Sequence, residues 1–145
     1  MPVPPRDTST GYVLEAMVLP ALERGGYQVK KQQEVARRPG GGRHKVDLVA
    51  QRPGEDAAVL VSLKWQQVSG TAEQKVPFEA ICLVEAIEQS QGHYRKAYLV
   101  LGGQGWSLRD FYVGGGLEEY IPRMHGIVEI LTLEDFVARA NAGDL

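Results

Sequence analysis

The most restrictive feature of the sequence is an apolar run over residues 57–65 in which the one charged side chain is Lys64. The run is rich in β-branched residues and follows a Pro-Gly turn, so it predicts a strand. Burying an ammonium group without a partner costs several kcal/mol. Lys64 must therefore either reach solvent near the strand end or face a carboxylate.

Asp47 poses the same problem in the preceding strand, predicted over residues 44–51, where its neighbours are apolar. If the two strands form a hairpin, Asp47 and Lys64 can lie side by side. Side chains alternate along a strand, so Ser62, Lys64 and Gln66 share one face. Taken alone, Asp47 and Lys64 are best explained as a structural ion pair at a strand end.

The rest of the pattern predicts helices around a sheet. A helix is expected over residues 11–23, with N-cap candidates before it and Pro20 as a kink or an end. A second helix is expected from Pro77, in its first turn, to about residue 91, and Thr132 with Asp135 begins a short third one. Strands are expected over residues 27–35, 44–51, 57–66, 96–101 and 127–131. A three-strand meander followed by a crossover helix predicts an α/β fold with a mixed sheet flanked by helices.

Two further carboxylates are predicted to point inward. Glu15 shares a helical face with apolar residues, so it either sits at the rim of that face or is directed into a site. Glu79 would fall in the first turn of the second helix, where the helix dipole favours a carboxylate for structural reasons alone. Glu73, expected in the preceding loop, is the alternative to Glu79.

Together these residues resemble the PD-(D/E)XK nucleases. The matching features are Glu15 on an N-terminal helix, Val46-Asp47 on one strand and Ser62-Leu63-Lys64 on the next, followed by a helix. The resemblance covers roughly residues 10–101 and implies the αβββαβ core of a restriction endonuclease-like fold.

The sequence departs from the family pattern at one position, because Ser62 stands where the second acid is expected. One group of type II restriction endonucleases in this superfamily also has Ser-x-Lys and takes the carboxylate from the next helix. The resemblance therefore implies that Glu79 replaces the missing acid, with Glu73 as the second choice.

The resemblance also implies a chemistry. Mg²⁺, or Mn²⁺ in its place, would be held by Asp47 and Glu79, because one or two carboxylates suffice for a cation that keeps several waters. Lys64 would orient or help deprotonate the attacking water, or offset phosphate charge. Glu15 could bind a second metal or a metal-bound water, and Gln66 could lie near the phosphate.

Charge is distributed unevenly along the chain. The net charge is −2, yet residues 28–45 carry six basic residues and a single acid, Glu34. Such a stretch is either a phosphate-binding surface or a solvated hairpin. The DNA-binding candidates are Lys30, Lys31, Arg37, Arg38, Arg43 and Lys45.

The leading hypothesis is a Mg²⁺-dependent DNA endonuclease of the restriction or junction-resolving type, acting as a homodimer because two strands need two symmetric sites. The alternatives are a catalytically inactive nucleic-acid-binding module, and a structural or interaction domain in which Asp47 and Lys64 form only an ion pair.

Composition sets the remaining limits. The 145 residues suit one domain over 1–145, with no run apolar enough to span a membrane and no apparent secretory signal. A single cysteine, Cys82, excludes an internal disulfide and a cysteine-based zinc cluster within one chain. The expected location is therefore the cytoplasm.

Overall fold

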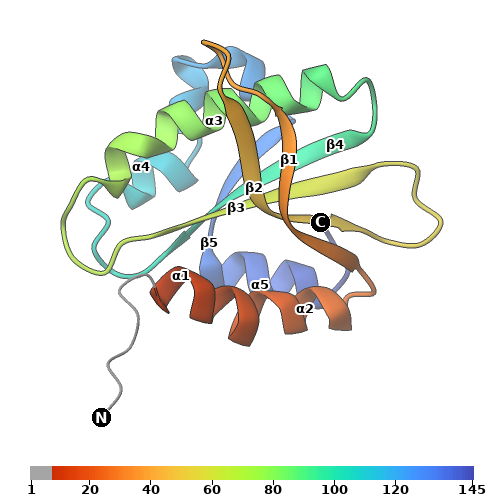
Figure 1. Ribbon diagram of the computed structural model, residues 1–145. Helices are drawn as coiled ribbons and strands as arrows, with labels where there is room; N and C mark the ends of the chain where they lie inside the picture. Colours follow the sequence, from red (N-terminus) through yellow and green to blue (C-terminus); the bar gives the residue numbers. More distant parts are fainter. Residues whose placement is uncertain (1–7) are drawn as a thin grey trace.

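The computed structural model describes residues 8–145 as a five-stranded mixed sheet with helices on both faces (Figure 1). The strands follow one another across the sheet in chain order, β1-β2-β3-β4-β5. The first three are antiparallel neighbours, whereas β3, β4 and β5 run parallel. The expected mixed α/β architecture is confirmed. The strands are β1 (Gln28–Arg37), β2 (Arg43–Gln51), β3 (Ala58–Trp65), β4 (Tyr94–Gly102) and β5 (Val128–Thr132).

The expected N-terminal helix is present but contains a wider turn. It consists of α1 (Thr8–Val13), the π-helical segment η1 (Leu14–Val18) and α2 (Leu19–Arg24). Pro20 gives a physical reason for the wide turn, because a proline ring inside an α-helix clashes with the carbonyl four residues earlier. The π turn lets Leu19 N–H donate to the carbonyl of Leu14, five residues back, and the helix continues past the proline.

The long helix α3 (Ala72–Gln89) begins five residues before Pro77, so the prediction that Pro77 starts the helix is wrong. Proline in a helix interior leaves the carbonyl of residue i−4 without its usual donor. Here that carbonyl belongs to Glu73, and the Tyr112 hydroxyl donates to it at 2.7 Å. A side chain from another element therefore satisfies the acceptor that Pro77 leaves free.

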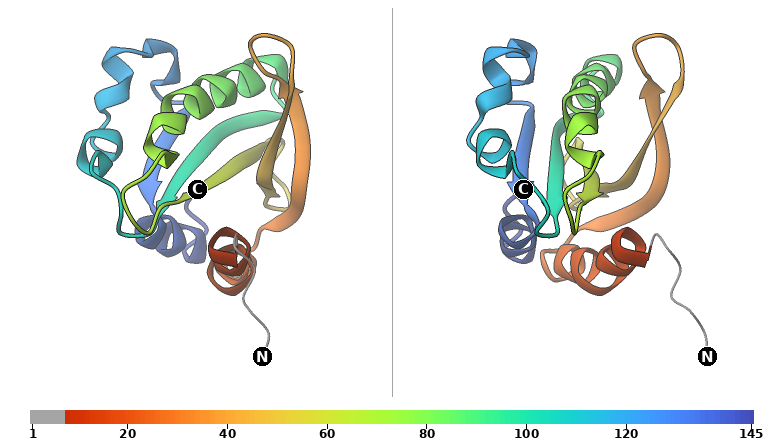
Figure 2. Two further views of the ribbon diagram at one scale, coloured as in Figure 1. Left: turned by 60° about the vertical axis from the view of Figure 1, so that its left-hand side comes forward. Right: turned by 90° about the vertical axis from the view of Figure 1, so that its left-hand side faces the viewer.

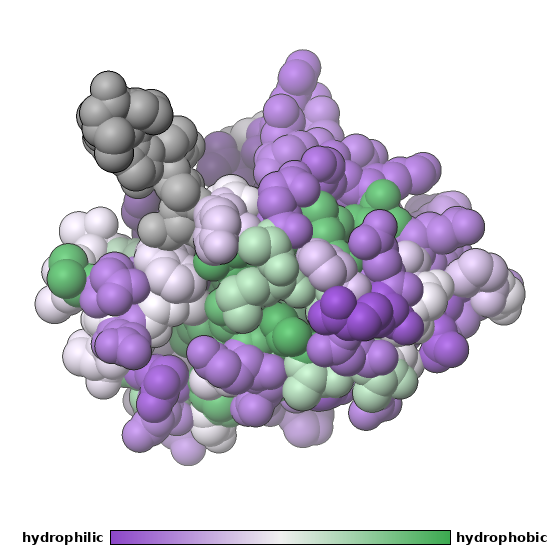
Figure 3. All heavy atoms as spheres, turned by 90° about the horizontal axis from the view of Figure 1, so that it is seen from below, coloured by the Kyte–Doolittle hydropathy of each residue, from purple (hydrophilic) through white to green (hydrophobic). Residues whose placement is uncertain are grey.

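The sheet separates two apolar cores. One lies between the sheet and the layer formed by α1, α2 and α5 (Leu133–Asn141), and it includes Leu22, Val61, Tyr98 and Phe136. The other lies beneath α3 and the short helices α4 (Arg109–Val113), η2 (Gly116–Glu119) and η3 (Pro122–Met124). Seen from the α1, α2 and α5 side, apolar side chains occupy the middle of the face and polar ones surround them (Figure 3).

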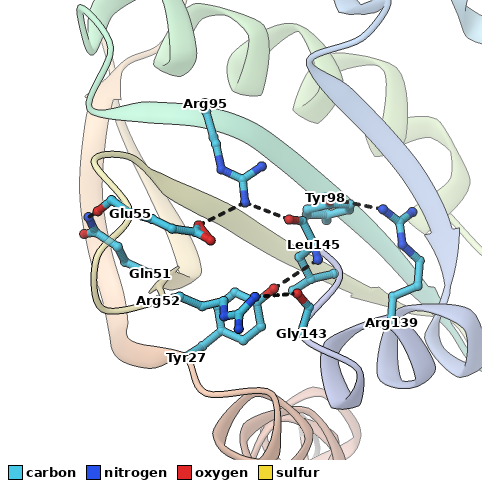
Figure 4. Close-up of polar contacts among 9 residues, drawn as sticks. All are labelled: Tyr27, Gln51, Arg52, Glu55, Arg95, Tyr98, Arg139, Gly143 and Leu145. Carbon is cyan, nitrogen blue, oxygen red and sulfur yellow. Dashed lines mark hydrogen bonds and ion pairs between the residues drawn. The ribbon is translucent and has the colours of Figure 1, made fainter.

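The C-terminal residues are tied back onto the domain. The N–H of Leu145 donates to the Tyr27 hydroxyl at 3.0 Å, and the guanidinium groups of Arg52 and Arg95 donate to the carbonyls of Gly143 and Leu145 at 3.0 and 2.7 Å (Figure 4). The expected cap of the last helix is confirmed, because Asp135 N–H donates to Thr132 Oγ1 at 3.2 Å. None of the described helices is long and apolar enough to cross a membrane.

The β1–β2 hairpin curls away from the rest of the sheet, and its tip reaches the level of α3 (Figure 2). Gln89 near the end of α3 holds it there. Its side chain accepts from the N–H of Arg37 at 3.1 Å and donates to the Arg37 carbonyl at 2.9 Å. The candidate site lies where this hairpin, β3 and α3 meet, because Asp47 contacts Leu63 and His44 contacts Glu79 there.

Candidate active site

Asp47 lies where β2 and β3 separate. The last residues paired between these strands are Leu48 and Val61, and beyond them the ladder ends. Beyond this point the Asp47 side chain replaces a backbone acceptor, because Leu63 N–H donates to Asp47 Oδ2 at 2.7 Å. A side chain thus satisfies a strand N–H that the diverging backbone no longer reaches.

Lys64 follows directly after Leu63 and continues β3 beside β4. The positive charge of Lys64 acts to lower the pKa of both Asp47 and Glu79, although burial leaves the pKa of Asp47 raised overall. Among the described residues no ion pair joins Lys64 to Asp47, so the expected side-by-side arrangement stays a prediction. Lys64 is only partly exposed, as expected for a cation with carboxylate neighbours.

Glu79 reaches the same place from α3. Its Oε2 lies 2.9 Å from Nε2 of His44, near the start of β2, and the Ser62 hydroxyl helps to lower the pKa of this carboxyl group. Both members of the His44–Glu79 pair are largely buried, with side chains 4% and 13% exposed. Ser62, which stands where the family pattern has its second acid, therefore influences the carboxyl group that is expected to replace that acid.

The two carboxyl groups differ in their electrostatics although both lie near Lys64. Burial raises the pKa of Asp47, and the Leu63 N–H, Lys64 and Gln32 only partly counteract it. Burial also acts on Glu79, but His44, Lys64 and Ser62 together outweigh it and lower the pKa of that carboxyl. Asp47 therefore remains short of positive partners, and a cation would favour its ionised form.

This donor set fits Mg²⁺ better than zinc. Mg²⁺ takes oxygen ligands, keeps several waters and needs only one or two carboxylates from the protein, whereas structural zinc needs four protein ligands. Asp47 and Glu79 supply two carboxylates that each use one oxygen for the contacts described above. Within residues 8–145, no three His, Cys, Asp or Glu side chains gather closely enough to form a complete protein cage.

Glu15 lies outside this group. It is exposed on the π-helical segment, and its Oε1 accepts from Nζ of Lys31 on β1 at 2.9 Å. In the part of the chain that the structure describes, no hydrogen bond or ion pair joins Glu15 to Asp47, Lys64 or Glu79. Of the two alternatives left open by the helical pattern, the structure shows Glu15 at the rim of the helix, paired with Lys31, and not directed into the site.

Gln66 also serves a different purpose. Its amide nitrogen donates to Glu73 Oε1 at 3.1 Å and to the Gly105 carbonyl at 2.7 Å, and its oxygen accepts from Ala72 N–H at 2.9 Å. These contacts occupy both ends of the amide and tie β3 to the start of α3. The amide therefore holds the scaffold together at this position.

Glu73 is fully engaged away from the site. Its carboxylate accepts from the N–H and hydroxyl of Ser107 and from the N–H of Leu108, at 2.7 to 3.1 Å, besides the bond from Gln66. Of these groups, the Ser107 N–H contributes most to lowering the pKa of Glu73. Between the two candidates for the replacing acid, Glu79 faces Lys64 and Glu73 does not.

All six basic candidates on the hairpin are exposed, but they divide into groups. Arg37, Arg38 and Arg43 surround the hairpin tip, beside α3. Lys30 and Lys31 lie toward the other end of β1, where Glu15 already neutralises Lys31. Arg38 also lies close enough to Cys82, one turn beyond Glu79 on α3, to influence the thiol electrostatically. Lys45 lies on β2 two residues before Asp47, and Lys31 pairs with Leu48 next to it, so the basic residues follow the hairpin from the site to the tip.

A comparison with protein families identifies a match over most of the chain. Residues 6–143 match the family model described as a PD-(D/E)XK nuclease superfamily domain. Among solved structures, the protein of unknown function AF1548 is similar, with 12% identity, a TM-score of 0.48 and coverage of 79% of this chain and 54% of that one. The small subunit of the heterodimeric restriction endonuclease R.BspD6I is similar with 15% identity, a TM-score of 0.40 and coverage of 81% and 60%.

The chain thus spans only 54% and 60% of the lengths of these two structures. No curated protein sequence matches it.

Proposed function

The chain belongs to the PD-(D/E)XK nuclease superfamily, and on that premise we propose that it is a Mg²⁺-dependent endonuclease that hydrolyses phosphodiester bonds in DNA. The observation that supports this proposal most directly is the convergence of Asp47, Lys64 and Glu79 from two strands and a helix. Perturbed carboxyl groups beside a lysine are a recognised mark of a reactive site.

Each of the three side chains has a role that follows from its surroundings. Asp47 and Glu79 would hold the cation, and each has one oxygen oriented by a neighbouring donor. Once bound, Mg²⁺ supplies Lewis-acid stabilisation of the charge that develops on the phosphoryl oxygens. Lys64 would place a further positive charge at the phosphate and orient the attacking water.

The hairpin would bind the nucleic acid beside the site. Arg37, Arg38 and Arg43 are exposed at its tip, and contacts of this type to phosphates position a duplex without reading its sequence. We further propose that the enzyme acts as a homodimer, because cutting both strands of a duplex is simplest with two symmetric sites.

The proposal is tested by incubating plasmid and branched DNA with Mg²⁺ or Mn²⁺. Cleavage should depend on the metal, and Asp47→Ala, Lys64→Ala and Glu79→Ala should each slow it at least about 100-fold, as expected when a group that stabilises transition-state charge is removed. Glu88→Ala is the matched control, because Glu88 is an exposed carboxylate on the same helix that contacts Arg123. It should cut like the wild type.

Two results would contradict the proposal. Cleavage that persists in Asp47→Ala would mean that the reaction occurs elsewhere. Salt-sensitive DNA binding without Mn²⁺ binding or cleavage would instead favour the inactive binding module, since the family pattern is incomplete at Ser62.

A further inference from the structure

His44 is a buried histidine that the sequence pattern gave no role. It is 3% exposed and begins the β2 strand that also carries Asp47. Its Nε2 lies 2.9 Å from Glu79 Oε2. Its other nitrogen, Nδ1, is buried and has no hydrogen-bond partner among the described residues.

The partner fixes the direction of this hydrogen bond. An ionised carboxylate only accepts, so Nε2 of His44 carries the proton and donates it to Glu79. The pKa of Glu79 is lowered, with the hydrogen bond from His44 the largest favourable cause, which agrees with an ionised acceptor. The tautomer therefore follows from the contact.

The unpaired Nδ1 indicates that packing alone does not explain His44. A buried polar atom without a partner costs free energy that an apolar ring of similar shape would avoid. The ring touches Glu79 through the one nitrogen that is satisfied. An imidazole is therefore needed at this position, rather than a phenyl ring, because it contacts Glu79.

We infer that His44 is a positioning residue that holds the Glu79 carboxylate in the orientation needed to bind the divalent cation, an inference that rests on the proposed function. Glutamate has three side-chain torsions, so a carboxylate on a helix needs an external donor to fix it. Asp47 is fixed in the same way by Leu63 N–H at 2.7 Å. Each carboxylate thus has one oxygen held by a donor from β2 or β3, and hydrogen-bonded partners of this kind tune metal affinity.

The test measures Mn²⁺ affinity by electron paramagnetic resonance in the absence of DNA, so that no turnover is involved. His44→Phe keeps a ring and removes the donor, and His44→Gln places an amide N–H near the position of Nε2. We expect His44→Phe to weaken Mn²⁺ binding about 10–100-fold, the usual range for a lost partner of a ligand. His44→Gln should stay within a few-fold of wild type.

A purely structural role predicts the opposite order. Phenylalanine would then be the better substitute, because it fills the buried space without a polar atom, and glutamine the worse. Thermal unfolding of both variants, followed by circular dichroism, establishes that the metal sites compared belong to folded proteins. If His44→Phe does not fold, His44→Gln is compared with His44→Asn, whose side chain is too short for its amide to reach Glu79. We then expect tight Mn²⁺ binding only in the glutamine variant.

A double-mutant cycle tests whether His44 affects Mn²⁺ affinity through Glu79. In a Glu79→Ala background, His44→Phe should cause no further loss of Mn²⁺ affinity, because the residue it positions is gone. Wild-type affinity in His44→Phe, or equal affinities in the glutamine and asparagine variants, would overturn the inference and leave the proposed function standing. A wild-type protein that binds no Mn²⁺ would overturn both.

Discussion

At the scale of single residues, the site depends on which partners each carboxylate has. Asp47 and Glu79 both lie near Lys64, but the pKa of the first is raised and that of the second is lowered. At Asp47 burial outweighs the favourable neighbours, whereas at Glu79 His44, Lys64 and Ser62 together outweigh burial. Several neighbouring groups therefore favour the ionised form of Glu79. The sequence pattern alone indicates only a glutamate on a helix.

A substitution at Ser62 can test whether Glu79 on α3 replaces the acid that the family pattern has at position 62 on β3. In Glu79→Ala, a second change of Ser62→Asp would return a carboxylate to the face of β3 that also carries Lys64. We expect Glu79→Ala to weaken Mn²⁺ binding, which Asp47 alone then provides, and the double variant to regain part of the lost affinity, measured by Mn²⁺ titration.

Ser62→Asn in the same Glu79→Ala background is the control, because asparagine has the size of aspartate without its charge. Equal Mn²⁺ affinities in the two double variants would show that a carboxylate at position 62 does not point into the site.

The sequence predicted part of this site for a clear physical reason. Charged residues within apolar strands need partners, and a short turn brings neighbouring strands together, so Asp47 and Lys64 were predicted to be adjacent. His44 could not be found in this way, because its partner Glu79 lies 35 residues away on a helix. Glu15 and Gln66 were predicted from periodicity, which indicates the face of a helix or strand but not the residue that a side chain contacts. In the folded chain Glu15 contacts Lys31, and Gln66 contacts Glu73.

At the scale of elements, the start of α3 shows how a tertiary contact changes a local preference. Proline favours the first helical turn because it lacks an N–H, and this preference led to a predicted start at Pro77. In the folded chain Tyr112 satisfies the Glu73 carbonyl, so the helix starts at Ala72 instead. Tyr112 is 39 residues from Glu73 in the chain, outside any sequence window used to predict helices.

The Glu73 network is expected to stabilise this junction of β3, α3 and the loop after β4. Glu73→Ala would remove the charged acceptor of the N–H groups of Ser107 and Leu108. We expect a loss of about 3 kcal/mol in the free energy of unfolding at pH 7, since a hydrogen bond to a charged group contributes about 1.5–3 kcal/mol. Urea unfolding measures it, and Glu134→Ala, on the exposed start of α5, is the control.

The same network predicts a pH dependence. The pKa of Glu73 is lower in the folded than in the unfolded chain, so its contribution is fully present above its ordinary value of 4.5. The contribution is lost as pH falls through the lowered folded value. The gap in stability between wild type and Glu73→Ala should therefore narrow below pH 4.5. A gap that stays constant down to acid unfolding would contradict the role assigned to this carboxylate.

At the scale of the whole molecule, the position of the basic hairpin matters more than the net charge of −2. The order of elements was enough to predict a mixed sheet between helices. It did not predict the curl of β1 and β2, which depends on contacts with α3 such as those between Arg37 and Gln89. The curl brings the tip of the hairpin, which carries exposed arginines, to the level of α3 (Figure 2).

This placement predicts how DNA binding responds to salt. Arg37 and Arg38 are exposed, and neither forms an ion pair among the described residues, so each is available to a phosphate. Replacing both by alanine should reduce the slope of log affinity against log salt concentration by about 2, as expected when two phosphate contacts are lost. Lys31→Ala is the comparison within the same hairpin, because Glu15 already neutralises that lysine at 2.9 Å and the slope should change little. Fluorescence anisotropy with a labelled duplex in Ca²⁺ measures both. An unchanged slope in the arginine variant would place the DNA on another face of the molecule, whereas a larger change in Lys31→Ala would place it along the base of the hairpin.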